Sequence, residues 1–160
     1  MRKLLTSGNP KIDKSVPYGY LTAILHLAPA DISGRDVCPW RTDGCTAVCL
    51  NVAGHGGIPK HGFDARGLPI NDVQKARLER TQLFFSDRQA FLARLEREIL
   101  CHANRAQKLG LKPAVRLNGT SDLPWEALNL PMFDRFFYVQ FYDYTKSARR
   151  MQAFMTEQLG

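Results

Sequence analysis

The chain has 160 residues, 44% of them hydrophobic and 23% charged, with a formal net charge of +7. This composition is ordinary for one folded domain and argues against disorder. No run approaches the roughly 18 apolar residues of a membrane span, and no secretory signal is evident, so we expect a cytoplasmic protein without a membrane partner. Most of the scattered basic residues, Arg77 and Arg80 among them, are expected at the solvated surface, although the positive charge favours polyanions such as nucleic acid.

The N-terminal part of the chain predicts an arm followed by a buried strand. Residues 1–19 contain several glycines and prolines and are expected to lie as an arm across the domain. Residues 20–28 form a short apolar run that Pro29 ends, which predicts a strand buried on both faces. His26 lies within this run, where a hydrogen-bonded core histidine is more typical than a metal ligand.

A cysteine loop, residues 34–62, follows this strand. Three of the four cysteines lie within twelve positions of one another: Cys38, Cys45 and Cys49. A single loop can direct thiols at this spacing to a common point, which is typical of a metal site. Thiolates bind zinc or an iron–sulfur cluster. The alternative is that the three cysteines are small buried hydrophobic residues.

The number of ligands separates the two metal interpretations. Zinc requires a fourth ligand, which His55 or His61 offers within the same loop. A 4Fe-4S cluster held by three cysteines instead leaves one iron open for a substrate or cosubstrate. Cys101 is a poor fourth ligand, because helical spacing places it on the polar side of a predicted helix.

Two helices are predicted between residues 71 and 110. Asn71 and Ser86, each followed three residues later by a glutamine, are expected to cap their first turns. In the second helix, apolar residues recur at helical spacing, and Gly110 is expected to end it in a left-handed conformation. His102 falls on the apolar face, which predicts a hydrogen-bonded core histidine.

Polar side chains follow two further predicted strands. The strand at residues 113–118 leads into a polar turn, in which Ser121 or Asp122 is equally suited to a site or to capping the next short helix. The strand at residues 136–142 leads into the sequence DYTK and a final helix. The element order predicts an α/β fold: a single domain over residues 1–160 with a parallel sheet and βαβ crossovers, like part of a TIM barrel.

Ligands of parallel sheets bind beyond the carboxyl ends of the strands. The cysteine loop and the two polar turns all follow such ends. We therefore expect the three segments to converge on one site, and this expectation is the main functional evidence from the residues themselves.

Four motifs occur in the order GNPKIDKSVPYGYLTAILHLAPADISGRDVCPWRTDGCTAVCLNVAGHG, VQKARLERTQLFF, VRLNGTSDLPWE and FYDYTK. Together they closely resemble a bacteriophage protein family called gene product eighty-eight. The resemblance implies a phage protein in the host cytoplasm and assigns no reaction to it.

More distantly, the chain resembles radical S-adenosylmethionine enzymes, in which three cysteines after the first strand of a partial barrel hold a 4Fe-4S cluster. The spacing of the cysteines here differs from the usual one. This resemblance implies that Cys38, Cys45 and Cys49 ligate iron and that S-adenosylmethionine occupies the open iron. It also implies catalytic roles for Asp122, Glu126, Asp143 and Lys146, and cofactor contacts from Gly54, Gly56, Gly57, Asn118, Ser121 and Tyr142.

Three functional hypotheses follow. The first is an iron–sulfur protein with a radical-type or redox enzymatic role. The second is a zinc-stabilised nucleic-acid-binding protein, in which basic residues contact phosphates and aromatics such as Tyr142 and Tyr144 stack on bases. The third is a small interaction protein that inhibits a host defence, in which the metal only holds the fold. A partial barrel commonly dimerises, so a homodimer is expected.

Overall fold

The computed structural model describes residues 2–8, 12–128 and 130–156. In these residues four strands form one sheet, in the order β1-β2-β3-β4. β1 (Leu5–Thr6) is antiparallel to β2 (Tyr20–Leu25), whereas β2, β3 (Lys112–Arg116) and β4 (Gln140–Phe141) are parallel. The α/β class is confirmed. The prediction of a parallel sheet like part of a TIM barrel is not confirmed, because β1 runs against its neighbour, which makes the sheet mixed, and the described sheet is not closed.

The segment predicted as an N-terminal arm takes part in the sheet and the core. Leu4 and Leu5 are buried, and Leu5 pairs with Leu25 of β2. The backbone amides of Leu4 and Leu5 donate to the carboxylate of Glu98, at 3.0 and 2.9 Å. β1 therefore covers the edge of β2 that would otherwise expose unpaired backbone groups. A 3-10 helix, η1 (Asp13–Tyr18), leads from this segment into β2.

Two long helices, α3 (Asp72–Ser86) and α4 (Arg88–Lys108), connect β2 to β3. The predicted cap of the first is confirmed, because the side chain of Asn71 accepts a hydrogen bond from the Gln74 amide. The predicted cap of the second is wrong by one residue. Asp87 accepts from the Ala90 amide at 2.9 Å, and its extended backbone separates the two helices. Gly110 has a φ of +68°, as predicted for the left-handed end of α4.

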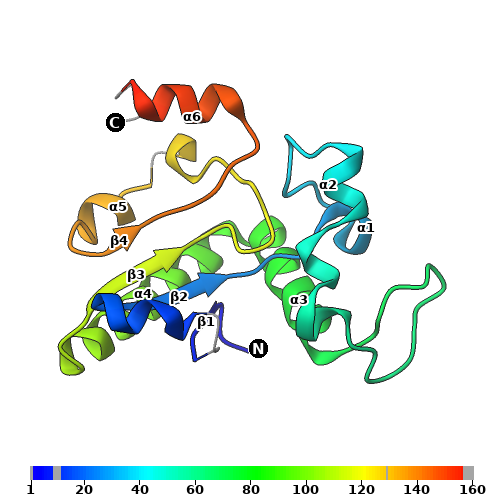
Figure 1. Cartoon of the computed structure of the whole chain (residues 1–160), viewed down its shortest axis with the longest axis horizontal. Coiled ribbons are helices and arrows are strands. Elements are labelled where there is room, and N and C mark those ends of the chain that lie inside the picture. The colour runs from blue at the N-terminus through cyan, green and yellow to red at the C-terminus, as the bar shows by residue number, and fades with distance from the viewer. Residues whose placement is uncertain (1, 9–11, 129, 157–160) are drawn as a thin grey trace.

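The core lies between α4 and the sheet, since α4 runs behind β2 and β3 (Figure 1). The apolar face predicted for α4 is buried against both strands, through Phe91, Leu95 and Ile99. His102 is buried as well, with its Nε2 3.0 Å from the carbonyl oxygen of Leu21. The prediction of a hydrogen-bonded core histidine is therefore confirmed, and burial lowers the pKa of His102.

Short elements surround this core. α1 (Ala30–Ser33) leads into the cysteine loop, and three others lie within it: α2 (Asp43–Ala47), η2 (Leu50–Val52) and η3 (Gly54–Gly57). Three more lie along the later part of the chain: η4 (Trp125–Leu128), α5 (Met132–Arg135) and α6 (Ala148–Met155). In Figure 1, α1 and α2 lie beyond the tip of β2, whereas α5 and α6 lie on the side of β4.

The strand predicted at residues 136–142 is largely wrong. Only Gln140–Phe141 pair with β3, because residues 136–139 form turns closed by backbone hydrogen bonds such as Val139 N to Phe136 O at 2.8 Å. Phe136 and Val139 are buried, while Phe137 and Tyr138 between them are exposed. The apolar run therefore wraps around the sheet edge. The strands predicted at residues 20–28 and 113–118 also end early, at Leu25 and Arg116.

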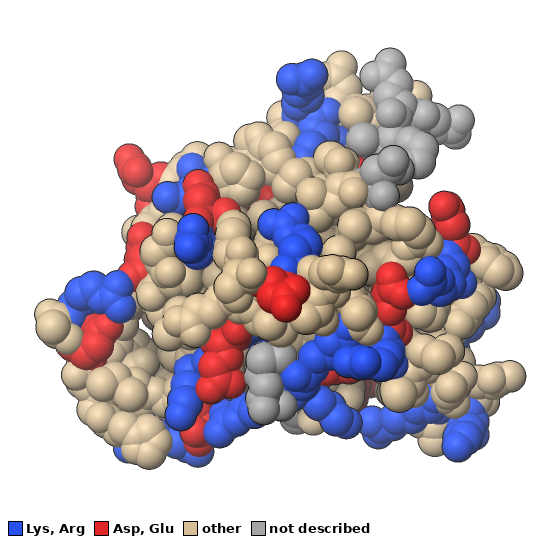
Figure 2. All heavy atoms as spheres, turned by 180° about the vertical axis from the view of Figure 1, so that it is seen from behind, with Lys and Arg blue, Asp and Glu red and all other residues tan. Residues whose placement is uncertain are grey.

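The surface charge is mixed over much of the molecule. On the face seen in Figure 2, acidic side chains are interspersed among basic ones. The positive net charge therefore does not form one uniform patch on that face. None of the helices in the described ranges combines the length and apolar character needed to cross a membrane.

Candidate functional site

A cavity of about 930 Å³ lies beyond the carboxyl ends of β2 and β3. Three segments form its wall: the cysteine loop, the turn after β3 and the DYTK segment after β4. The structure thus brings together the three segments that were expected to converge. All three clustered cysteines line this cavity: Cys38, Cys45 and Cys49. We call it the cysteine cavity.

Two of the thiols have opposite environments. Cys38 is partly buried, with its Sγ 3.8 Å from the carbonyl oxygen of Thr120. Burial, together with the nearby Cys49 and Asp122, raises the pKa of the Cys38 thiol to about 11. Cys45 accepts a hydrogen bond from the hydroxyl of Thr42 at 3.3 Å, which lowers the pKa of its thiol. Cys45 is therefore much easier to ionise than Cys38.

The cysteine cavity does not contain a preformed site for a single metal ion. In the part of the chain that the structure describes, no group of three or more His, Cys, Asp or Glu side chains is close enough to hold one. Neither His55 nor His61 lines the cavity, and both side chains are exposed. The fourth protein ligand that zinc requires is thus not supplied by either histidine in this arrangement.

Two glycines of the loop, Gly56 and Gly57, pack closely against the backbone of η2. A Cβ at Gly56 would lie 2.4 Å from the carbonyl oxygen of Asn51, and one at Gly57 would lie 2.1 Å from that of Val52. The carbonyl oxygen of Gly56 also accepts hydrogen bonds from the side chains of Asn71 and Gln74 in the next helix. These contacts explain why the loop needs glycine here. Gly54, Gly56 and Gly57 do not line the cysteine cavity.

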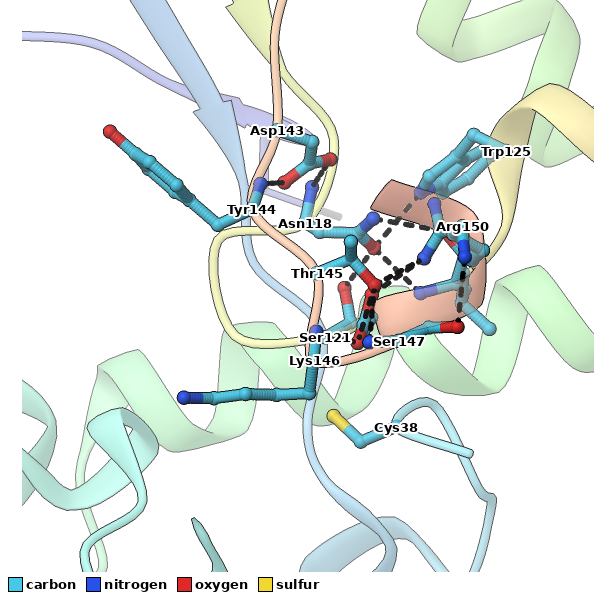
Figure 3. Close-up of polar contacts among 12 residues, drawn as sticks. Cys38, Asn118, Ser121, Trp125, Asp143, Tyr144, Thr145, Lys146, Ser147 and Arg150 are labelled. Carbon is cyan, nitrogen blue, oxygen red and sulfur yellow. Dashed lines mark hydrogen bonds and ion pairs between the residues drawn. The ribbon is translucent and has the colours of Figure 1, made fainter. Parts of the chain in front are cut away.

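Asn118 organises the turn after β3. Its Oδ1 accepts hydrogen bonds from the Ser121 hydroxyl at 2.8 Å, the Leu123 amide at 3.0 Å and the Trp125 indole at 3.1 Å (Figure 3). Both predicted cofactor contacts in this turn, Asn118 and Ser121, are therefore engaged with each other. Neither Ser121 nor Asp122 directs its side chain to the first turn of η4, because their hydrogen bonds go elsewhere.

Arg150 of α6 pairs with two of the predicted catalytic carboxylates. Its Nη1 donates to Asp122 at 2.7 Å, while its Nε and Nη2 donate to Glu126 at 2.6 and 2.8 Å (Figure 3). The guanidinium carbon also lies 5.1 Å from the ring centroid of Trp40 in the cysteine loop. Burial lowers the pKa of Arg150, but the hydrogen bonds and charges of the two carboxylates outweigh it and raise the pKa overall.

The carboxylate of Asp122 also holds the DYTK segment in place. Oδ2 of Asp122 accepts hydrogen bonds from the Lys146 amide at 2.8 Å and the Thr145 hydroxyl at 3.1 Å. Asp122 is thus a positioning residue that joins the turn after β3 to the segment after β4. The side chain of Lys146 extends away from this network, lines the cysteine cavity and forms no ion pair within the described residues.

Asp143 is the predicted catalytic carboxylate with the most distinct electrostatics. It accepts hydrogen bonds from the amides of Asn118 and Tyr144, both at 2.9 Å, and lies 3.5 Å from Nε of Arg116. Burial raises the pKa of Asp143, and the hydrogen bonds and Arg116 only partly oppose this effect. Asp143 and Tyr142 line a second cavity of about 460 Å³ between β4 and α6. We call it the aromatic cavity.

Comparison with known proteins gives a family. The family model described as gene product 88 matches residues 2–159, which is nearly the whole chain. The chain belongs to the gene product 88 family. No curated protein and no solved structure matches it. The resemblance to radical S-adenosylmethionine enzymes is therefore unsupported, whereas the resemblance to gene product 88 is confirmed.

In this gene product 88 chain, two arginines that were expected at the surface are buried. Arg77 and Arg80 of α3 are 8% and 5% exposed. Arg77 donates to both the carbonyl oxygen and the side-chain oxygen of Asn51, at 2.6 and 2.8 Å, and so holds the segment that follows Cys49. Arg80 donates to the carbonyl oxygen of Lys3. Composition alone could not separate these arginines from solvated ones.

These arginines lead to a pH prediction for the gene product 88 fold. Burial, assisted by Arg77, Arg80 and Arg116, lowers the pKa of His26 from 6.5 to about 4. Between these values the unfolded chain binds a proton that the folded chain does not, so the free energy of unfolding should fall as the pH falls. The full effect is about 3 kcal/mol. Urea denaturation at pH 7 and pH 4.5 measures most of this effect.

The matched variant is His26→Asn, which removes the titrating ring. We expect this variant to lose clearly less stability than the native chain between the two pH values, because its folded and unfolded states no longer differ in protonation at this position. Equal losses in both proteins would contradict the assignment.

Proposed function

We propose that this chain is an iron–sulfur protein, in which Cys38, Cys45 and Cys49 hold a 4Fe-4S cluster for a redox or radical-type reaction. The observation that carries the proposal is that all three cysteines line one cavity at the carboxyl ends of β2 and β3. Three cysteine ligands leave one iron of such a cluster without a protein ligand. That iron would be open to a substrate in the cavity.

The donor set and the size of the cavity favour a cluster over a single ion. Within the described residues no three ligand side chains converge closely enough for one ion, yet the three cysteines line the same cavity of about 930 Å³. A cluster is larger than an ion, so its ligands stand further apart. Thiolates are also the usual ligands of iron–sulfur clusters.

The charge behind the loop supports an anionic occupant. Arg77 is buried, forms no ion pair with a carboxylate among the described residues, and its buried Nε has no hydrogen-bond partner. A buried cation without an anion is unfavourable. Burial lowers the pKa of Arg77 to about 10, while negative charge on Cys49 acts in the opposite direction. Thiolates ligated to a cluster would supply the missing negative charge.

When bound, the cluster supplies one-electron transfer. The remaining work falls to the chain itself. The half-buried position of Cys38 beside Thr120 limits access of water, and Lys146 adds positive charge to the wall. Asp143, whose pKa burial raises, lines the neighbouring aromatic cavity.

Anaerobic reconstitution with iron and sulfide tests the proposal. We expect a brown protein with about four iron and four sulfide per chain. Cys38→Ser, Cys45→Ser and Cys49→Ser should each lose most of the iron, because each removes one of three ligands. Cys101→Ser is the matched control, since this thiol is exposed on α4 and should not affect the iron content.

Circular dichroism of each variant separates loss of ligand from loss of fold. A colourless protein with one zinc per chain would replace the cluster with a mononuclear site. Iron loss in Cys101→Ser as large as in the other three variants would also contradict the proposal, because it would show that no particular cysteines are required.

A further inference from the structure

The cysteine cavity and the aromatic cavity share part of their walls. Tyr144 and Thr145 line both of them, so the DYTK segment separates the two spaces. Each volume, about 930 and 460 Å³, lies in the range of small-molecule sites. The two sides of this shared wall differ in chemistry, because one is cationic and the other is aromatic.

On the cationic side, one side chain has no ion pair among the described residues, and another has a buried N–H group without a hydrogen-bond partner. Lys146 lines the cysteine cavity and has no ion pair within the described part of the chain. Arg116 lines it too, and its buried Nε has no hydrogen-bond partner, since Asp143 is 3.5 Å away. An unsatisfied buried N–H is costly, and a guanidinium is well suited to phosphate oxygens.

The carboxylates near this wall are each paired with an arginine. Asp122 lines the cysteine cavity, but Arg150 pairs with it at 2.7 Å. Glu126, in the aromatic cavity, pairs with the same arginine at 2.6 Å. Asp143, in the aromatic cavity, lies 3.5 Å from Nε of Arg116. Lys146 is therefore the cation of the shared wall that no carboxylate of the described residues pairs with.

On the aromatic side, two tyrosines leave ring surface accessible. Tyr142 and Tyr144 are 36% and 66% exposed, and their ring centroids are 6.4 Å apart in an edge-to-face arrangement. The guanidinium of Arg116 lies 4.6 Å from the centroid of Tyr144. In Figure 3, Tyr144 points away from the network around Arg150. Exposed aromatic rings beside cationic groups are typical stacking platforms for nucleobases.

We propose that this shared wall is a nucleotide-binding site. A phosphate would lie against Arg116 and Lys146, and the base would stack on Tyr144 beside Tyr142. The unit recognised is a phosphate with its base, either as a free nucleotide or within a single strand. The site goes beyond the proposed function, because it uses none of the three cysteines and should bind its ligand in metal-free protein.

Calorimetric titration of the metal-free protein tests the site with four probes: inorganic phosphate, adenosine, AMP and a short single-stranded oligodeoxyadenylate. We expect AMP to bind more tightly than phosphate or adenosine, because it alone of these three uses both halves of the wall. Affinity should fall with added salt. If the oligonucleotide binds more tightly than AMP, the natural ligand is a single strand. If AMP binds more tightly than the oligonucleotide, the natural ligand is a free nucleotide.

Variants separate the two halves of the site. Arg116→Gln should weaken AMP and phosphate by about tenfold or more. Lys146→Gln, in an exposed segment, should act in the same direction without a risk to folding. Tyr144→Leu should weaken AMP roughly tenfold and leave phosphate unchanged. The matched controls, Arg149→Gln and Tyr138→Leu, replace exposed side chains outside both cavities and should have no effect.

Absence of binding by every probe, or AMP affinity unchanged in both Arg116→Gln and Lys146→Gln, would overturn the proposal. Failure of the iron–sulfur proposal can be distinguished from failure of the nucleotide site. Cysteine variants that lose iron but still bind AMP support both proposals, whereas a native chain that binds AMP but never iron supports only the nucleotide site.

Discussion

Replacing Arg150 by Met should lower the free energy of unfolding by about 3–5 kcal/mol. The guanidinium pairs with Asp122 and Glu126 at 2.7 and 2.6 Å, and the side chain of Asp122 is only 8% exposed. Removing the cation leaves a buried carboxylate without its partner, which costs more than the pair itself contributes. Chemical denaturation of the native chain and of the variant measures the difference.

Arg149→Met is the matched control, because Arg149 is the exposed neighbour on α6 and its replacement should change stability by about 0.5 kcal/mol or less. The double variant Arg150→Met with Asp122→Asn should lose less than the sum of the two single variants, since the unpaired buried charge is then absent. A loss in Arg150→Met no larger than in Arg149→Met would refute a structural role for Arg150.

Phe84→Ala should be comparably destabilising, by about 3–5 kcal/mol, because it opens a cavity where three parts of the chain meet. Phe84 is 1% exposed. Its ring centroid lies 5.2 Å from that of Phe91 in α4 and 5.4 Å from that of Trp125 in η4, and the guanidinium of Arg88 lies 4.0 Å from it. Thermal and chemical denaturation together measure the loss.

Phe137→Ala removes the same side chain at a position that is 84% exposed, and should change stability by about 0.5 kcal/mol or less. Because Trp125 also donates its indole hydrogen bond to Asn118, Phe84→Ala should in addition alter the near-ultraviolet circular dichroism of the turn after β3. Similar losses in the two phenylalanine variants would contradict the packing described above.

These expectations change the roles assigned to the polar residues after β3 and β4. Asp122 and Glu126 are held by Arg150, and Asn118 and Ser121 are engaged with each other, so all four have partners within the protein. Asp143 lines the aromatic cavity but pairs with Arg116 and accepts two backbone hydrogen bonds, whereas the side chain of Lys146 lines the cysteine cavity without an ion pair in the described residues. We therefore propose that the chemistry of the site depends on fewer of the predicted residues, together with Arg116, which was not among the predicted site residues.

The sequence by itself determined the parts of the fold that local interactions control. The cap at Asn71, the apolar face of α4 and the left-handed end at Gly110 all follow from hydrogen bonds and periodicity within a few residues. The meeting of the three strand-end segments also followed, because strands that run in parallel place their carboxyl ends at one edge of the sheet.

Only the tertiary structure decided which charged groups meet and which apolar residues pair. Arg150 reaches Asp122 across 28 positions, and Arg77 is buried against Asn51 across 26, so no local pattern indicates either contact. Leu5 joins the sheet antiparallel, and residues 136–139 turn instead of pairing, because burial of Phe136 and Val139 outweighs their preference for a strand. Long-range packing and charge pairing depend on the assembled fold, whereas helix caps and periodicity depend only on neighbouring residues.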